Sequence, residues 1–379
     1  MRIGIDIRSL QTESQFRGIG TYTYNLIKHL VEVNSENQYI FFASAYRPLK
    51  DLGEGLRRNL VWLRRPARLT SLTDQLFWYN TLKAYRIEVF HTTELAVPKF
   101  SPCRRVITVH DLIPLIFQEY KRLPKLAHYL VYLLKFRSTQ WAEKVIAVSE
   151  SVKNDLIRIL GLPEENLHVV YEGVQGCFQP FLPADRVEAM KKKYRINRDY
   201  LIFPCGFEPR KNVSTAIRAF HRALKRLPDG YQLALVGNLS PESWRVKQCI
   251  YQRGLEKEVL LTGYVPPEEL CYLYNGAKLC LFPSLHEGFG LPVLEAMACG
   301  LPVIASNDTS LPEVAGDAAV LVNPYSVEAI AEAIVRVLTD PDLQRSLKEK
   351  GLKRAALFSW DRVAGETLKV YQSLVKRSP

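Results

Sequence analysis

The chain has 379 residues, a length that accommodates two or three domains of average size. Hydrophobic residues make up 47% of it, and no uninterrupted apolar run reaches about 18 residues, so we expect a water-soluble globular protein and exclude a membrane-spanning one. The formal net charge of +12 is compatible with an anionic ligand, an anionic membrane surface or nucleic acid, and it does not choose among them.

The cysteines and the first residues indicate the cellular compartment of the protein. Seven cysteines are scattered along the chain without a C-x-x-C pair, which is typical of reduced residues in a cytoplasmic protein and not of disulfides or a metal site. The opening residues, Met1 to Asp6, place an acid in the first apolar run, so we expect no signal peptide.

Strands and helices alternate along the first half of the chain, which predicts an α/β fold with a parallel sheet. The predicted strands lie at residues 2–7, 38–44, 60–63, 89–91, 106–109, 145–148 and 167–171. The loop 8–20 contains Gly18 and Gly20, and a helix is predicted over 21–33. A glycine loop before a helix lets backbone N–H groups approach a phosphate, although the pattern is not G-x-G-x-x-G. Ser149 is a good N-cap for a helix that continues to Leu160.

The alternation of strands and helices is interrupted at residues 166–200 and then resumes. Gly176, Pro180 and Pro183 follow one another closely, and we place a domain boundary at about residue 180. In the second half the predicted strands lie at 200–203, 233–236, 259–261, 279–282, 303–305 and 320–322. Ser310 and Glu313 form a capping box for another helix, and further helices extend to about Val375. Two similar domains joined by a short linker predict a ligand cleft between them.

The stretch Lys278 to Ser306 carries the strongest chemical signal. A strand leads into a glycine-containing loop at 284–291, and a helix is predicted from Pro292 to a left-handed cap at Gly300. The free N–H groups at the start of such a helix attract anions, while the carboxylates of Glu287 and Glu295 suit hydroxyl groups. The pattern therefore indicates a ligand with both phosphate and sugar.

Glu287 and Glu295, spaced E-x7-E within HEGFGLPVLEAMACGLPVIAS, closely resemble the signature of retaining nucleotide-sugar glycosyltransferases of family four. The resemblance extends to RGIG at 17–20, His110 with Asp111, EPRKN at 208–212 and TGYV at 262–265. It implies the GT-B fold, with two Rossmann-like domains facing across a cleft. Residues 1–180 would form the acceptor domain, 181–358 the donor domain, and a C-terminal helix within 359–379 would pack back on the first domain.

The resemblance also implies roles for particular residues. Glu287 would contact the hydroxyls of the donor sugar and Glu295 those of the ribose, while Arg210 and Lys211 would neutralise the diphosphate. His110 would hydrogen-bond the donor sugar. The catalytic residues expected are thus His110, Glu287, Arg210 and Lys211, and the donor-binding residues Gly18, Gly20, Gly206, Val265, Gly288, Phe289, Gly290, Leu291 and Glu295.

Plainer interpretations exist for each of these residues. The two glutamates are also compatible with a capping and a surface acid, Arg210 and Lys211 with a solvated basic turn, and the glycines with ordinary turns. His110, and more so His91 and His286, could be structural. Asp111 is better suited to orienting its loop than to acting as a base.

The function implied is transfer of a hexose, preferably mannose from GDP-mannose, to a hydroxyl of a glycan or lipid-linked acceptor with retention of configuration. RGIGTYTYNL and EPRKN look most like the loops of bacterial mannosyltransferases. A UDP-sugar is the alternative donor, and a non-catalytic nucleotide-sugar-binding subunit is the alternative role. A NAD-dependent oxidoreductase is disfavoured because no G-x-G-x-x-G follows either first strand. Because the resemblance implies catalysis that does not depend on a metal, neither a metal nor another cofactor is expected.

Residues 121–141, KRLPKLAHYLVYLLKFRSTQW, are basic, aromatic and apolar. They suit peripheral contact with the anionic inner face of a membrane, or equally a helix buried on one side with Lys and Arg at its rim. Nucleic acid is not an expected partner, because no recognised motif accompanies the charge.

Overall fold

The computed structural model describes residues 1–12, 18–49, 52–64, 72–94, 96–117, 125–228, 230–239 and 243–375. The chain divides into two compact units, one formed by 1–173 with 359–379 and the other by 174–358. The chain thus leaves the first unit after Gly173, several residues before the boundary expected near 180. Gly173 is held there by the start of the last helix, since an added Cβ would lie 2.7 Å from the Trp360 backbone nitrogen.

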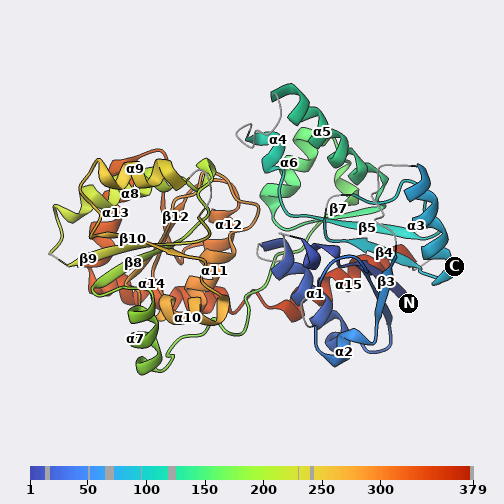
Figure 1. Ribbon diagram of the computed structural model, residues 1–379, viewed down its shortest axis with the longest axis horizontal. Helices are drawn as coiled ribbons and strands as arrows, with labels where there is room; N and C mark the ends of the chain where they lie inside the picture. The colour runs from blue at the N-terminus through green and yellow to red at the C-terminus, as the bar shows by residue number, and fades with distance from the viewer. Residues whose placement is uncertain are drawn as a thin grey trace. The chain divides into compact units, whose positions relative to one another are not determined.

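The first unit is built on a parallel sheet with the strand order β3-β2-β1-β4-β5-β6-β7. Its strands are β1 (Arg2–Asp6), β2 (Gln38–Ser44), β3 (Leu60–Leu63), β4 (Val89–Thr92), β5 (Arg104–Val109), β6 (Lys144–Ala147) and β7 (Leu167–Val169). The helices α1 (Gly18–Val33), α2 (Glu54–Arg57), α3 (Leu72–Ala84), α4 (Ile113–Ile116), α5 (Lys125–Arg137), α6 (Glu150–Leu160) and α15 (Trp360–Val375) flank this sheet (Figure 1).

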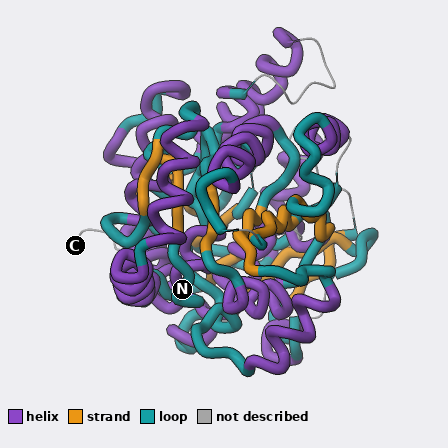
Figure 2. The backbone as a smooth tube through the Cα atoms, turned by 90° about the vertical axis from the view of Figure 1, so that its left-hand side faces the viewer, coloured by secondary structure: helices purple, strands orange, loops and turns teal. Residues whose placement is uncertain are grey.

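The second unit has a parallel sheet with the order β10-β9-β8-β11-β12-β13. Its strands are β8 (Asp199–Pro204), β9 (Tyr231–Val236), β10 (Val259–Gly263), β11 (Leu279–Phe282), β12 (Val303–Ser306) and β13 (Val320–Val322). Its helices are α7 (Ala184–Lys193), α8 (Val213–Leu224), α9 (Ser243–Tyr251), α10 (Pro267–Gly276), α11 (Leu291–Ala298), α12 (Leu311–Ala315), α13 (Val327–Thr339) and α14 (Pro341–Ala355). The tube view shows strands enclosed by helices (Figure 2).

The predicted α/β class with parallel sheets is confirmed, and every predicted strand is present with its ends shifted by a residue or two. The short apolar runs are strands because both of their faces are buried, as in β4 and β11, where every residue is buried. In both sheets the strand order reverses beside the first strand, between β1 and β4 and between β8 and β11. That reversal is where doubly wound sheets bind their ligands.

Helix α6 begins and ends as predicted. The Ser149 hydroxyl accepts a hydrogen bond from the Val152 N–H at 3.0 Å, and Gly161 ends the helix with φ +65°. The start of α1 was predicted wrongly, since the helix begins at Gly18 and both Gly18 and Gly20 lie in its first turn. Arg17 lies outside the described residues.

Helix α15 returns to the first unit and packs against α1. Its Tyr371 hydroxyl is 2.6 Å from Nδ1 of the fully buried His91 on β4, and Nε2 of His91 is 2.8 Å from the Thr108 hydroxyl on β5. Burial, with the nearby His110, lowers the pKa of His91 to about 3, so its imidazole is neutral. His91 is therefore structural: it joins α15 to the sheet.

Candidate active site

Several residues predicted to bind the donor lie at the carboxyl ends of β8 and β11, where the strand order of the second sheet reverses. Residues 205–212 follow β8 and residues 283–290 follow β11. The backbone of Leu285 donates to the Arg210 carbonyl at 2.7 Å, which joins the two loops directly. The Asn212 amide, which begins α8 in a left-handed conformation, donates to the carbonyl of Pro283 at 3.0 Å.

A buried carboxylate lies between two cations at this edge. Arg210 Nη1 is 2.9 Å from Glu287 Oε2, and Lys211 Nζ is 2.7 Å from Glu287 Oε1. The side chains of all three are at most 15% exposed. Glu287 is thus neither a capping nor a surface acid, and Arg210 and Lys211 do not form a solvated turn.

The electrostatics of this ion-pair cluster, Arg210, Lys211 and Glu287, favour an anion. Burial by itself would raise the pKa of Glu287, but the charges of Lys211 and Arg210 outweigh it and lower the pKa to about 2. The carboxylate is ionised at neutral pH, so these three side chains together carry a net charge of +1. Helix α11 begins at the end of the same loop, and the positive end of its dipole adds to this field.

Two residues after β12 hydrogen-bond through their hydroxyl groups to the backbone of the loop that carries Glu287. The sequence did not identify them as site residues. Thr309 Oγ1 accepts from the Glu287 N–H at 3.2 Å. Ser310 Oγ donates to the carbonyls of Glu287 at 3.0 Å and Phe289 at 2.7 Å. The predicted capping box at Ser310 is therefore wrong: this hydroxyl makes no cap bond to α12 because it is used by the neighbouring loop. The polar run Asn307 to Ser310 after a buried strand was the available signal.

Close packing and a positive φ require glycine at one position of the site. Gly290 has φ +112°, and a Cβ there would lie 2.6 Å from a methyl group of Leu311. At Gly206 a Cβ would meet the carboxylate of Glu208, which folds over this glycine. Oxygen Oε2 of Glu208 is buried and has no hydrogen-bond partner among the described residues.

The other residues predicted to bind the donor lie on α11, in the loop before it, or after a strand. Glu295 lies on α11, where its Oε2 accepts from the Tyr274 hydroxyl at 3.3 Å. Leu291 is the first residue of α11, Phe289 is buried against the ring of Phe358, and Gly288 lies in the loop between Glu287 and Phe289. Val265 follows β10, and its side chain is buried.

His110, Gly18 and Gly20 belong to the first unit. His110 directly follows β5, and its Nδ1 is 3.0 Å from Oε1 of Glu172, which lies after β7. Asp111 accepts from the Ile113 N–H at 3.0 Å and so shapes the start of α4, as expected of a residue that orients its loop. In the second unit the His286 side chain is buried, and its carbonyl accepts from Arg210 at 3.3 Å.

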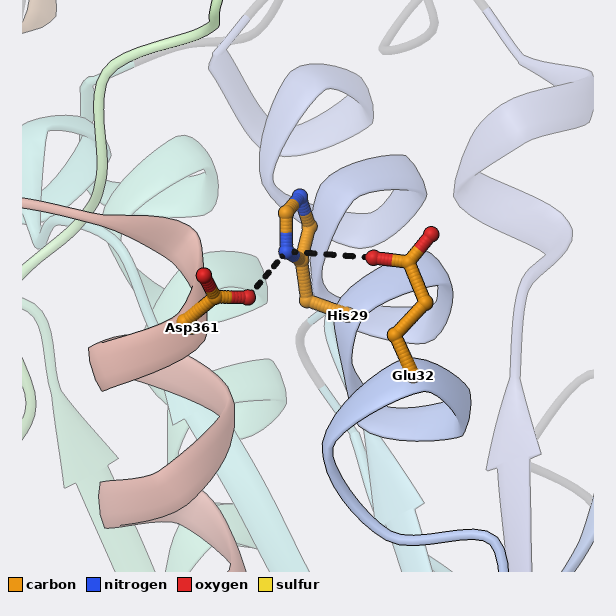
Figure 3. Close-up of side chains that lie close together, drawn as sticks. All are labelled: His29, Glu32 and Asp361. Atoms are coloured by element: carbon orange, nitrogen blue, oxygen red, sulfur yellow. Dashed lines mark hydrogen bonds and ion pairs between the residues drawn. The ribbon is translucent and has the colours of Figure 1, made fainter.

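Within the described residues, one group of side chains offers ligand atoms for a metal ion: His29, Glu32 and Asp361, all within 4.8 Å of one another. His29 on α1 lies 2.7 Å from Asp361 on α15 and 3.5 Å from Glu32 (Figure 3). Both carboxylates are more than half exposed. The hydrogen bond between the two helices accounts for this arrangement without an ion.

The chain matches two family models that together cover most of its length. Residues 16–175 match the model of glycosyltransferase family 4, and residues 186–354 match that of glycosyl transferases group 1.

Relatives with curated names point in the same direction. O-antigen chain mannosyltransferase B of Escherichia coli is 29% identical over 94% of this chain and 96% of its own. Serotype-specific mannosyltransferase WbdA of Escherichia coli is 28% identical over all of this chain, which spans about half the length of WbdA (49%). Among solved structures, Anabaena HepE in complex with UDP and glucose superimposes with a TM-score of 0.78 at 18% identity, over 99% of this chain and 100% of HepE.

Proposed function

The chain belongs to glycosyltransferase family 4 and has the GT-B fold, and on that premise we propose that it moves mannose from GDP-mannose to a hydroxyl of a glycan or lipid-linked acceptor, with retention of the anomeric configuration. The observation that carries the proposal is the ion-pair cluster at the strand-order reversal of the second sheet. It combines a net positive charge with a carboxylate, as a phosphorylated sugar donor requires.

The cations have the main part in the proposed reaction. When the bond from the anomeric carbon to the diphosphate breaks, negative charge develops on the departing phosphate oxygen. Arg210 and Lys211 stabilise that charge, and stabilisation of this kind is usually the largest catalytic contribution. Glu287 keeps both cations in place before the donor binds, because it pairs with each through a different oxygen. The oxygen of the acceptor hydroxyl then bonds to the anomeric carbon on the face that the diphosphate leaves, and the hydroxyl proton passes to the departing diphosphate oxygen.

The two glutamates divide the recognition of the donor in this proposal. An ionised carboxylate only accepts hydrogen bonds, so Glu287 suits the hydroxyls of the sugar and Glu295 those of the ribose. The Tyr274 hydroxyl, which donates to Glu295, orients that carboxylate on α11. The reaction needs no metal or other cofactor in this scheme, because the two cationic side chains neutralise the diphosphate.

Relatives named mannosyltransferases support mannose as the transferred sugar, and GDP-mannose is its proposed donor. A UDP-sugar is the alternative, favoured by the fold shared with HepE, which was solved with UDP and glucose. The test is a comparison of GDP- and UDP-sugars by thermal shift and by release of the nucleoside diphosphate. We expect GDP-mannose to raise the melting temperature most and to release GDP slowly. A larger effect of a UDP-sugar would mean that the donor is a UDP-sugar and not GDP-mannose. No stabilisation by any nucleotide sugar would contradict the proposal.

Turnover separates an enzyme from a non-catalytic subunit that only binds the nucleotide sugar. With GDP-mannose and an alkyl α-mannoside as a probe acceptor, we expect GDP release to rise above simple hydrolysis. The anomeric signal of the product in NMR then reports the stereochemistry, and an α-mannoside from the α-linked donor indicates retention. A β-linked product would refute retention while leaving transfer itself intact.

We propose in addition that α5 touches an anionic membrane at the cytoplasmic face. Leu130 and Leu134, one helical turn apart, are 46% and 66% exposed, and Lys135 and Arg137 are exposed nearby. Residues Lys121 to Pro124 of the predicted segment lie outside the described residues. No helix in the described part of the chain is both long and apolar enough for a bilayer crossing.

Flotation with vesicles that contain phosphatidylglycerol tests the contact of α5 with a membrane. The wild-type protein should float with the vesicles, whereas the double variant Leu130→Glu, Leu134→Glu should not. Equal flotation of the two would refute the contact.

A further inference from the structure

We propose that Glu172 is the positioning residue of His110: it holds the imidazole in the tautomer that presents Nε2 as a hydrogen-bond acceptor for a hydroxyl of the sugar substrate. The proposal rests on the proposed glycosyl transfer. It concerns residues of the first unit alone, and its evidence is the geometry around the His110 ring.

The two side chains meet at the ligand-binding edge of the first sheet. His110 directly follows β5 and Glu172 lies just after β7, so both stand at the carboxyl ends of parallel strands. Nδ1 of His110 is 3.0 Å from Oε1 of Glu172. The side chains are only 10% and 5% exposed, so water competes little for this hydrogen bond.

A third side chain sets the plane of the ring. The edge-on contact of Tyr22 with His110 has a centroid separation of 4.7 Å and an interplanar angle of 82°. Tyr22 is itself fully buried, with its hydroxyl 3.0 Å from Thr108 and its ring 5.8 Å from that of Trp360. Glu172 and Tyr22 therefore fix both the rotation and the tilt of the imidazole.

The opposite nitrogen is available for a ligand. Nε2 of His110 is buried and has no hydrogen-bond partner in the described part of the chain. Buried polar atoms in native proteins nearly always have a partner, so an exception at the ligand edge of a sheet points to a group supplied from outside. His91, on the neighbouring strand β4, has both ring nitrogens bonded within the protein, whereas Nε2 of His168, inside β7, is also buried without a partner among the described residues.

The chemistry of the pair identifies the kind of group that would bind. A neutral imidazole has one N–H and one acceptor nitrogen, and an ionised carboxylate can only accept. The hydrogen bond to Glu172 therefore places the proton on Nδ1 and leaves the lone pair on Nε2. A lone pair pairs with a donor, which in a sugar substrate is a hydroxyl group, and it repels the oxygens of a phosphate.

The tautomer can be measured without any assay of activity. In protein labelled with ¹⁵N-histidine, long-range ¹H–¹⁵N spectra distinguish a protonated from an unprotonated ring nitrogen, and His110→Gln identifies the His110 signals by their loss. At pH 7.5 we expect a protonated Nδ1 and an unprotonated Nε2. A proton on Nε2, whether alone or together with one on Nδ1, would overturn the proposal.

Variants at Glu172 test the consequence for catalysis. Glu172→Gln keeps an acceptor oxygen of the same reach, whereas Glu172→Met keeps the length and removes the acceptor. We expect Glu172→Met to lose the Nδ1–H tautomer and to lower kcat for GDP release by about 100-fold, the usual cost of a misplaced group, with little change in KM for GDP-mannose. Glu172→Gln should restore the tautomer and most of kcat.

A matched control separates positioning from general stability. Glu143, on the same unit, pairs with Arg105 at 2.7 Å and is also mostly buried. Glu143→Gln should lower the melting temperature while leaving the His110 tautomer and kcat unchanged. A Glu172→Met protein with an altered tautomer and unchanged kcat would refute the role of Glu172. If the wild-type protein releases no GDP at all, the proposed function fails, but the spectrum of His110 still decides the tautomer.

Discussion

Replacement of Glu287 by glutamine should destabilise the second unit strongly at neutral pH. The substitution keeps the shape of the side chain and removes the charge that Arg210 and Lys211 share. The two cations would then lose a buried countercharge that both of them share, which is the costly way to break a buried ion pair.

The pKa of Glu287 sets the magnitude. A shift from 4.5 to about 2 corresponds to about 3 kcal/mol of favourable interaction, at 1.36 kcal/mol per pKa unit. In a unit of this size, a loss of about 1 kcal/mol lowers the melting temperature by roughly 2–4 °C, so we expect a decrease of about 6–12 °C. The exposed pair of Arg222 and Glu328 provides the control, since Glu328→Gln should cost less than about 1 kcal/mol.

The pH dependence has a definite sign. Because the folded protein lowers the pKa of Glu287, the stabilisation is complete above pH 5 and is lost as the pH falls towards 2. Between pH 7 and pH 3.5, the difference in unfolding free energy between wild type and Glu287→Gln should shrink by about 1.4 kcal/mol. Urea unfolding followed by circular dichroism at both pH values measures it.

Two results would refute this reasoning. One is a destabilisation by Glu287→Gln at pH 7 no larger than that of Glu328→Gln. The other is a gap between wild type and Glu287→Gln that is equal at pH 7 and pH 3.5, which would mean that the carboxylate is not held ionised by its neighbours.

Three further predictions concern the site and its loops. Lys211→Met should lower kcat for GDP release by about 100- to 1000-fold, the usual loss for a group that stabilises developing charge, and a smaller effect than tenfold in steady-state kinetics would argue against its role. Gly290→Ala should cost about 1–3 kcal/mol in thermal unfolding because of its positive φ and the nearby Leu311, whereas Gly365→Ala on α15, with open space around it, should be neutral or stabilising; equal effects would contradict the packing argument. Excess EDTA should leave GDP release unchanged, and a loss restored by Mg²⁺ would show that a metal assists the two cations.

Part of the architecture could be predicted from local sequence, because strands and helices leave local traces. The short apolar runs predicted all the strands, and Ser149 and Gly161 mark the ends of α6. Predictions from local sequence failed where a side chain bonds to a partner distant in sequence instead of to its own helix. Ser310 has the sequence of a capping residue, but its hydroxyl bonds to carbonyls more than twenty residues earlier.

The candidate site likewise combines features that local sequence predicts with features that depend on residues distant in sequence. The spacing of Glu287 and Glu295, with the glycines around them, was enough to indicate a ligand with phosphate and sugar, since a loop and the helix after it are contiguous in sequence. The pairing of Glu287 with Arg210 and Lys211 joins residues about 76 positions apart, and no local pattern contains it.

By itself, the sequence determined the α/β class, the order of the elements and the family, because these depend on residue periodicity and on motifs within single loops. Only the tertiary structure decided which charges neutralise one another and which nitrogen of His110 has no partner among the residues that the structure describes. Both outcomes depend on burial, which makes an electrostatic contact strong, and burial is a property of chain segments brought together from distant parts of the sequence.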